Sequence, residues 1–134
     1  MGLATVAVYS DADAQALHVQ EAGSAVALGG TLSADSYLRI DKLLAAAKTA
    51  GADAVHPGYG FLSENAEFAQ AVLDAGLTWV GPPPAAIRAL GNKASAKSLA
   101  LQHNVPCLSG YQGQDQSDQR LTAEADKLGY PLRV

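Results

Sequence analysis

The sequence is poor in cysteine, and this scarcity excludes two classes of protein. Its 134 residues include a single cysteine, Cys107, so neither an intramolecular disulfide nor a cysteine-based metal site can form within the chain. The three histidines have no partner at metal-ligand spacing, so we predict no metal site. A lone cysteine is typical of a reducing compartment, and we expect a cytoplasmic location.

Charge and long apolar runs are also scarce. Only 16% of the residues are charged, and nine basic against thirteen acidic residues give a net charge of −4. This balance argues against a nucleic-acid partner, which would require a basic face, but it leaves room for one local phosphate site. No apolar run approaches the roughly 20 residues of a membrane span, and the first residues lack the pattern of a signal peptide. We therefore expect no membrane partner.

What the sequence does contain is a regular alternation of strand and helix patterns. Hydrophobic residues make up 49% of the chain, enough for a folded domain of ordinary size. Periodicity and turn residues predict strands at 5–9, 24–28, 54–56, 78–80 and 130–134, and helices near 17–19 and at 40–50, 65–75, 84–90, 92–103 and 121–128. Strands that alternate with helices indicate an α/β fold, with a parallel sheet covered on both faces.

The stretch from His56 to Asn65 stands at the centre of this pattern. An apolar strand precedes it, and Asn65 is suited to cap the helix that follows. In an open α/β sheet, ligands bind at such loops from the carboxyl end of a strand to a helix. A second interpretation stays open, in which the stretch is a tight turn and Tyr59 and Phe61 pack into the core.

The string His-Pro-Gly-Tyr-Gly-Phe-Leu-Ser-Glu-Asn at 56–65 resembles the signature of the biotin carboxylase family, the ATP-dependent part of biotin-dependent carboxylases. The resemblance covers nearly the whole chain. It includes segments at 5–10, 18–19, 36–38, 81–82, 91–97, 105–106 and 129–131.

The resemblance implies a Rossmann-like (pre-ATP-grasp) fold. Residues 1–110 would form the N-terminal domain, incomplete at its N-terminus, and 111–134 a connecting segment and the truncated start of the ATP-grasp domain. The family opens with a strand and a glycine-containing turn, and this sequence begins after both. We therefore expect the strand order 24–28, 5–9, a vacant slot, 54–56, 78–80. Unpaired edges at that slot should make the isolated chain unstable or self-associating.

The resemblance also implies a function. Such an enzyme is a ligase that uses MgATP and bicarbonate to carboxylate biotin on a carrier domain. Lys93 matches a lysine that contacts ATP phosphate. A lysine at a helix N-terminus suits an anion site, although a solvated surface lysine is the alternative. The wall of the carboxylation site, on the biotin and bicarbonate side, would comprise His56, Tyr59, Gly60, Phe61 and Glu64. We expect Glu64 to orient rather than act as general base, and His56 to be buried and hydrogen-bonded rather than catalytic.

The implied cofactors are ATP, Mg²⁺ and biotin. The implied partners are the remainder of the biotin carboxylase, a biotin carboxyl carrier domain, a carboxyltransferase subunit or domain, and a second copy in a homodimer. The family's magnesium carboxylates and glycine-rich phosphate loop follow the point where this sequence ends. We therefore assign no catalytic residue and expect the chain alone to be inactive.

Two alternatives stay open. One is an inactive fragment or degenerate gene product that keeps only the fold. The other is a related ATP-grasp ligase such as a carbamoyl phosphate synthase, against which the string at 56–65 argues. The choice of acyl acceptor lies in another subunit or domain of such enzymes, so this sequence does not identify the acceptor.

Overall fold

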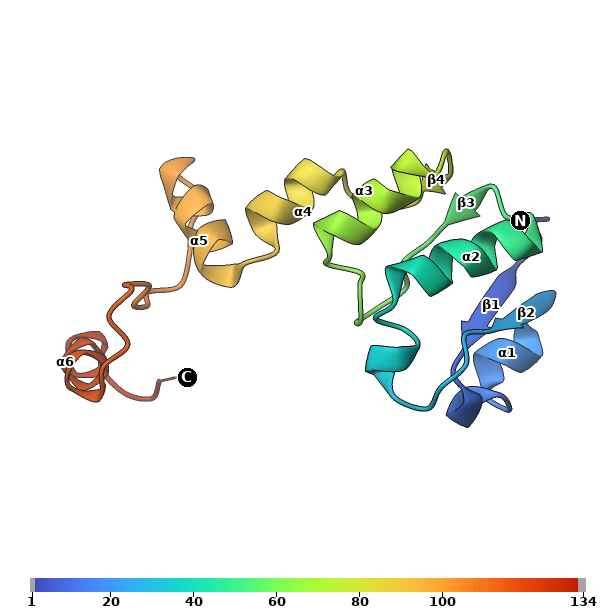
Figure 1. Cartoon of the computed structure of the whole chain (residues 1–134). Coiled ribbons are helices and arrows are strands. Elements are labelled where there is room, and N and C mark those ends of the chain that lie inside the picture. The colour runs from blue at the N-terminus through green and yellow to red at the C-terminus, as the bar shows by residue number, and fades with distance from the viewer. Residues whose placement is uncertain (1, 133–134) are drawn as a thin grey trace. The chain divides into compact units, whose positions relative to one another are not determined.

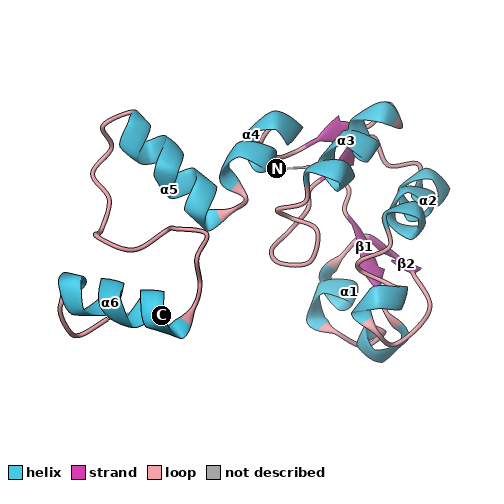
Figure 2. Ribbon diagram, turned by 60° about the vertical axis from the view of Figure 1, so that its left-hand side comes forward, coloured by secondary structure: helices cyan, strands magenta, loops and turns pink. Residues whose placement is uncertain are grey.

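The computed structural model describes residues 2–132, and their contacts divide the chain into two compact units on either side of the Gly91–Asn92 bond. The first unit contains β1 (Val6–Tyr9), α1 (Leu17–Glu21), β2 (Ser24–Ala27), α2 (Ile40–Ala50), β3 (Ala54–Val55), α3 (Ala66–Asp74), β4 (Thr78–Trp79) and α4 (Pro84–Leu90), with short 3-10 turns η1 (Asp11–Asp13) and η2 (Ser33–Asp35). The second unit contains α5 (Lys93–Gln102) and α6 (Asp118–Leu128) (Figures 1 and 2). Within the described residues, no helix is long and apolar enough to span a bilayer.

The helix boundaries follow the capping residues of the sequence. The side chain of Asn65 accepts a hydrogen bond of 2.8 Å from the Phe68 N–H and so caps α3, as predicted. Gly51 ends α2 in the left-handed region at φ 64°, where a residue without Cβ avoids strain. Pro84 occupies the first position of α4, where its missing N–H costs no helical hydrogen bond.

The strands form two separate parallel pairs. β1 pairs with β2 in the register Val6–Ser24 to Tyr9–Ala27, and β3 pairs with β4. Both pairings are those predicted from the sequence. Among the described residues no ladder joins β1 to β3, and a cavity of about 550 Å³ lies between them. The predicted gap in the sheet is therefore present.

Helices pack on both strand pairs. α1 contacts β1, and α2 contacts both β1 and β2. α3 contacts both α2 and β4. The main core lies where α3 packs on α4 and β4, and consists of Leu62, Phe68, Ala69, Val72, Trp79 and Ile87.

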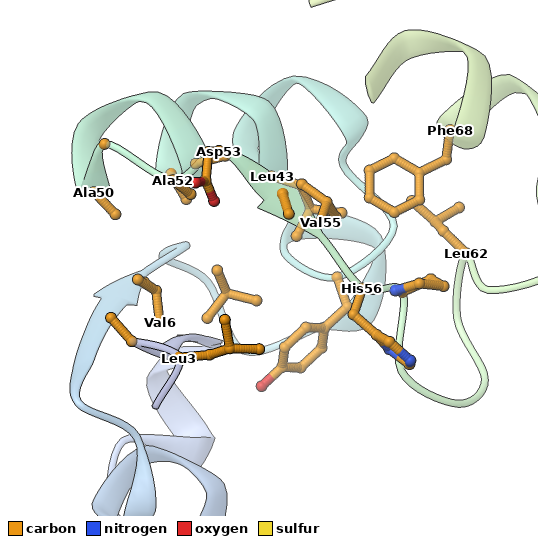
Figure 3. A pocket seen from close by; sticks show the side chains of 18 of the residues that line it. Leu3, Val6, Leu43, Ala50, Ala52, Asp53, Val55, His56, Leu62 and Phe68 are labelled. Carbon is orange, nitrogen blue, oxygen red and sulfur yellow. The ribbon is translucent and has the colours of Figure 1, made fainter. Parts of the chain in front are cut away.

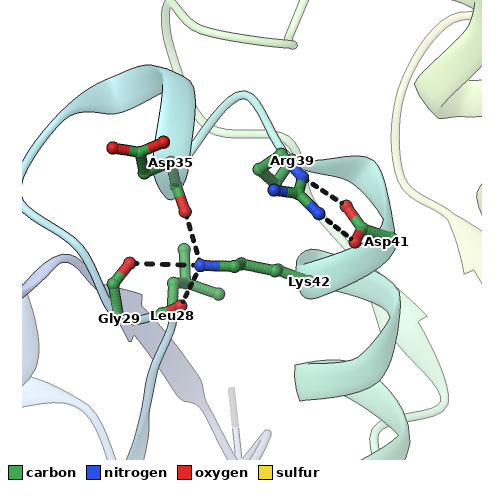
Figure 4. A network of polar contacts seen from close by, with 6 residues as sticks. All are labelled: Leu28, Gly29, Asp35, Arg39, Asp41 and Lys42. Atoms are coloured by element: carbon green, nitrogen blue, oxygen red, sulfur yellow. Dashed lines mark hydrogen bonds and ion pairs between the residues drawn. The ribbon is translucent and has the colours of Figure 1, made fainter.

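A lysine fastens the loop that follows β2. The Nζ of Lys42 donates hydrogen bonds to the carbonyl oxygens of Leu28 at 2.8 Å and Asp35 at 2.6 Å (Figure 4). A longer contact of 3.4 Å reaches the Gly29 carbonyl. One ammonium group on α2 thus donates hydrogen bonds both to the end of β2 and to η2. It holds the carboxyl end of β2 against the helix.

The second unit is thinly packed. None of the residues of α5 or α6 is buried. Each helix is capped at its start, α5 by Asn92 and α6 by Ser117, whose side chains accept backbone N–H groups. The predicted strand at 130–134 is absent at 130–132, and residues 133–134 lie outside the described residues.

Candidate functional site

Residues 56–65 form a loop from the carboxyl end of β3 to the N-terminus of α3. Gly58 and Gly60 have φ values of 67° and 76°, which favour glycine. Phe61 also has a positive φ of 43°, an uncommon backbone conformation for an aromatic residue. The Gly60 carbonyl accepts from the Ser63 N–H at 2.9 Å, which closes a tight turn around Phe61. The loop is therefore a shaped turn with its own hydrogen bonds.

Leu62 anchors this turn in the core, and Tyr59 points away from it. Leu62 is buried among the core residues of α3, β4 and α4. Tyr59 is 99% exposed, so burial cannot explain a tyrosine at this position. The interpretation in which Tyr59 packs into the core is wrong, because the two glycines turn the chain outward before Leu62 turns it back.

The ring of Phe61 packs against that of Tyr37, which precedes α2. The two rings stack at a centroid distance of 4.7 Å and an interplanar angle of 28°, although Phe61 stays 59% exposed. Phe61 therefore does not pack into the main core either. The contact links the loop after β3 to the loop before α2, and stacking of this kind adds about 0.5–1.5 kcal/mol beyond area burial.

Tyr37 is itself fixed by a small polar network. Its hydroxyl donates to Asp13 Oδ2 at 2.6 Å and accepts from the buried Ser10 N–H at 3.0 Å. The Ser10 hydroxyl donates to the same carboxylate oxygen at 2.7 Å. Hydrogen bonds from Tyr37 and Ser10 lower the pKa of Asp13, while burial and the bond to Asp13 raise the pKa of Tyr37. This network was not predicted, since only the fold brings together residues 24 positions apart.

His56 departs from the prediction in part. It is exposed, not buried, because it follows the short β3 at the edge of the cavity. It is hydrogen-bonded as predicted, but to its own loop: Nδ1 accepts from the Gly58 N–H at 3.0 Å. Because Nδ1 accepts this hydrogen bond, the proton of the neutral imidazole lies on Nε2. The imidazole thus stabilises the turn.

Four of the five predicted wall residues gather around one hollow of about 250 Å³. Tyr59, Gly60, Phe61 and Glu64 line it together with Ser63, a residue the sequence analysis left out although it lies inside the motif. His56 lines the larger cavity instead. The hollow is thus lined by two aromatic rings, the carboxylate of Glu64 and the hydroxyls of Tyr59 and Ser63.

Lys93 belongs to the second unit. It is exposed and is the first residue of α5, the position that was predicted from the sequence. Asn92 occupies one helical amide by accepting from the Ser95 N–H at 3.0 Å. An ammonium group beside free amides at a helix start suits a phosphate, and a solvated lysine has the same geometry.

Comparisons with known proteins identify the family of the chain. Residues 1–87 match the family described as "Biotin carboxylase, N-terminal domain". The chain belongs to this family. It is 47% identical over 134 residues to the mitochondrial methylcrotonoyl-CoA carboxylase subunit alpha of Mus musculus, covering 100% of this chain and 19% of the relative. It is 48% identical over 134 residues to the propionyl-CoA carboxylase alpha chain of Ruegeria pomeroyi, covering 100% of this chain and 20% of the relative.

Solved structures give the same family. The biotin carboxylase–β,γ-ATP complex from Campylobacter jejuni superimposes with a TM-score of 0.79 at 36% identity, covering 94% of this chain and 28% of that one. The biotin carboxylase domain of a single-chain bacterial carboxylase gives 0.77 at 45% identity, covering 88% and 27%. The α/β fold expected from the resemblance is confirmed, and the chain spans only part of these proteins.

Proposed function

We propose that the chain acts as the N-terminal part of a biotin carboxylase, the ligase that uses MgATP and bicarbonate to carboxylate biotin on a carrier domain. The observation that carries the proposal is the loop 56–65. It bears the string that resembles the family signature, it is anchored by Leu62, and it presents an almost fully exposed Tyr59. A structural turn has no need of an exposed aromatic side chain at its tip, whereas a wall that contacts a ligand does.

The hollow beside this loop supplies the chemistry we assign to the wall. Tyr59 and Phe61 offer ring faces for the bicyclic ring of biotin, and backbone groups at Gly60 can approach a ligand closely. Glu64 is exposed and makes no ion pair in the described residues, so its carboxylate is available to orient a hydrogen-bond donor. We assign it positioning rather than proton abstraction.

Lys93 is the residue we assign to ATP. Its ammonium group and the first amides of α5 form a cation and a set of donors of the kind that hold phosphate. The Campylobacter jejuni relative, described as an ATP complex, supports a nucleotide in this family. The described residues contain no cluster of three acidic, histidine or cysteine side chains suited to Mg²⁺. They do not fit the metal, and we derive no step through it.

The proposed partners rest on the domains that the larger relatives contain beyond the part matched by this chain. Solved relatives include a complete multifunctional pyruvate carboxylase and a single-chain, multi-domain acyl-CoA carboxylase. We propose that this chain works with the remainder of a biotin carboxylase, a biotin carrier domain and a carboxyltransferase, with residues 1–110 in the N-terminal domain and 111–134 leading out of it. A cytoplasmic location and a homodimer stay predictions; several relatives are named as mitochondrial.

The second candidate is an inactive remnant that keeps the fold. It is favoured by the gap between β1 and β3, which leaves the sheet in two pairs. The DNA on either side of the reading frame separates the two candidates. An in-frame glycine-rich loop downstream supports the enzyme, and a stop codon supports the remnant.

A chimera tests the proposal directly. The 134 residues replace their aligned segment in the Ruegeria pomeroyi propionyl-CoA carboxylase alpha chain, where the two are 48% identical. Bicarbonate- and biotin-dependent release of phosphate from ATP is then measured. We expect activity in the chimera, with a loss of about tenfold or more for Tyr59→Ala. The matched control is Leu32→Ala, which truncates a side chain 64% exposed outside the loop.

Two results would contradict the proposal. A folded chimera without activity would show that this segment cannot serve as a biotin carboxylase N-terminus. Equal activity of the Tyr59→Ala and Leu32→Ala chimeras would remove the functional role of the exposed ring.

A further inference from the structure

The turn at the tip of the loop 56–65 holds one residue in an unfavourable backbone conformation. Phe61 has a positive φ of 43°, and it follows Gly60, whose carbonyl accepts from the Ser63 N–H at 2.9 Å and closes the turn. Glycine adopts such a conformation freely, whereas a residue with a Cβ keeps it only where its surroundings hold it. A phenylalanine at this position therefore needs contacts that fix its backbone.

Contacts on two sides fix this conformation. On the carboxyl side, Leu62 is buried in the main core, where it lies near Phe68 (Figure 3). On the other side, the exposed ring of Phe61 stacks on Tyr37, with 4.7 Å between the ring centroids. Tyr59 comes two residues before Phe61 and is almost fully exposed, so its direction follows the backbone of the turn rather than packing of its own.

Hydrogen bonds hold the ring of Tyr37 at both of its ends. Its hydroxyl donates to Asp13 Oδ2 at 2.6 Å and accepts from the Ser10 N–H at 3.0 Å. Its backbone follows Ser36, a fully buried residue whose Oγ donates to the Leu32 carbonyl at 2.8 Å. A side chain that is fixed at its backbone and at its tip keeps one orientation, and it can therefore support the ring stacked on it.

From this geometry we propose that Tyr37 is a positioning residue of the candidate wall. Through its stack on Phe61 it holds the strained turn, and the turn sets the direction in which Tyr59 meets a ligand. The proposal rests on the proposed function, because the direction of Tyr59 matters only where a ligand such as biotin contacts it. Tyr37 does not line the hollow beside the loop, so we assign it no contact with the ligand.

A purely structural role of Tyr37 predicts a different outcome, which makes the two roles separable. If the stack served only the stability of the fold, its loss would lower the fraction of folded enzyme. The apparent kcat would then fall, and the KM values for biotin and ATP would both stay the same. If the stack positions the wall, the KM for biotin rises and the KM for ATP does not.

Hydrogen–deuterium exchange in the chimera with the Ruegeria pomeroyi chain tests this support without any catalytic activity. The N–H groups of Gly58 and Ser63 donate hydrogen bonds within the loop, at 3.0 and 2.9 Å, and report on its order. In Tyr37→Leu, which removes the ring, we expect exchange in the peptide 56–65 to accelerate about threefold or more, with the α3 peptide 66–74 unchanged. Tyr37→Phe keeps the ring and should accelerate exchange less.

Kinetics of the same chimera test the effect on the ligand. Tyr37→Leu should raise the KM for biotin about three- to tenfold, the effect expected from the loss of one aromatic stack, and leave the KM for ATP unchanged. Tyr37→Phe, the matched control, retains the stack and should keep most of the original KM for biotin. Asp13→Asn weakens the hold on the Tyr37 hydroxyl, and a smaller rise confined to biotin gives the same test if Tyr37→Leu fails to fold.

A double variant shows whether Tyr37 acts through Phe61. Glycine at position 61 adopts a φ of 43° without strain and carries no ring, so Tyr37 has nothing to hold there. Whatever KM for biotin Phe61→Gly has by itself, we expect Tyr37→Leu to add no further change to it. An equal rise with phenylalanine or glycine at position 61 would overturn the proposal, and so would an unchanged KM for biotin in Tyr37→Leu.

The two measurements separate this proposal from the proposed function. A folded chimera without activity would contradict the proposed function, and amide exchange in 56–65 would then decide the positioning role. Equal exchange in Tyr37→Leu and in the original chimera would overturn that role, because the loop would keep its order without the ring.

Discussion

Removal of one hydroxyl, in Tyr37→Phe, tests how much the polar network of Tyr37, Asp13 and Ser10 contributes to the stability of the chain. The Tyr37 hydroxyl donates to Asp13 at 2.6 Å and accepts the Ser10 N–H at 3.0 Å. Phenylalanine keeps the ring that stacks on Phe61 and loses both hydrogen bonds. Ser10 is 2% exposed, so its N–H is left without a partner in a place that water reaches poorly.

The expected loss follows from these two bonds. An unpaired buried donor costs about 1–3 kcal/mol, and a hydrogen bond to a charged group contributes a similar amount. Because Tyr37 and Asp13 are only partly buried, water screens and partly replaces the bond between them. We therefore expect the free energy of unfolding to fall by about 1–2 kcal/mol.

Urea unfolding measures this change, with the fluorescence of the single tryptophan, Trp79, as the signal from the core. Tyr59→Phe is the matched control. It removes the same hydroxyl from a side chain 99% exposed, and should change the free energy by less than about 0.5 kcal/mol. Equal midpoints for Tyr37→Phe and the original chain would refute the reasoning.

The same variant should alter the pH dependence of stability. Hydrogen bonds from Tyr37 and Ser10 lower the pKa of Asp13 below its ordinary 3.8, so the stability they give is present above that pH and is lost as pH falls through the lowered pKa. Burial and Asp13 raise the pKa of Tyr37 above 10.0, so its contribution is present below that pH and is lost as pH rises through the raised pKa. In Tyr37→Phe the alkaline loss should disappear and the acid loss should become smaller.

Four further predictions test other parts of the chain. Lys42→Met, which leaves the Leu28 and Asp35 carbonyls without their donor, should cost about 1.5–3 kcal/mol in urea unfolding, whereas Lys48→Met on the exposed side of α2 should cost little. In the chimera, Lys93→Ala should weaken ATP binding by about 1.5–3 kcal/mol in calorimetry, and an unchanged affinity would mean a solvated lysine. The isolated chain should melt below about 60 °C or self-associate, and a cooperative, monomeric melt above that temperature would contradict this. The isolated chain should also release no phosphate from MgATP in the presence of bicarbonate and biotin, because binding without contacts to the transition state does not accelerate the reaction. Turnover above that of a Lys93→Ala control would show that the active site is misplaced.

Much of the fold was predictable because it rests on local signals. Asn65 and Asn92 are good caps, Pro84 suits a first helical position, and the apolar periods of α2 and α3 are strong. The extent of each strand was less certain, since β3 and β4 are short and tertiary contacts decide where pairing stops.

The candidate site was predictable in its residues and less so in their environment. The string at 56–65 gave the members of the wall, but the exposure of His56 and Tyr59 depends on how the loop leaves β3. The support from Tyr37 to Phe61 was not predictable, because the two residues lie 24 positions apart and no local pattern pairs them. Fold-dependent contacts of this kind are the ones that single-sequence reasoning misses.

The cavity between β1 and β3 and the candidate wall share residues, which couples the two. His56 and Phe61 line the cavity as well as belonging to the loop, and Tyr37 lines it while stacking on Phe61. Leu62, the next residue, lies in the core formed by α3, α4 and β4 and lines the cavity as well. Occupation of the cavity would therefore restrain Phe61 both directly and through Tyr37, whereas Glu64 lies outside the lining. Filling the cavity should thus rigidify the side of the hollow that carries Phe61 more than the side that carries Glu64.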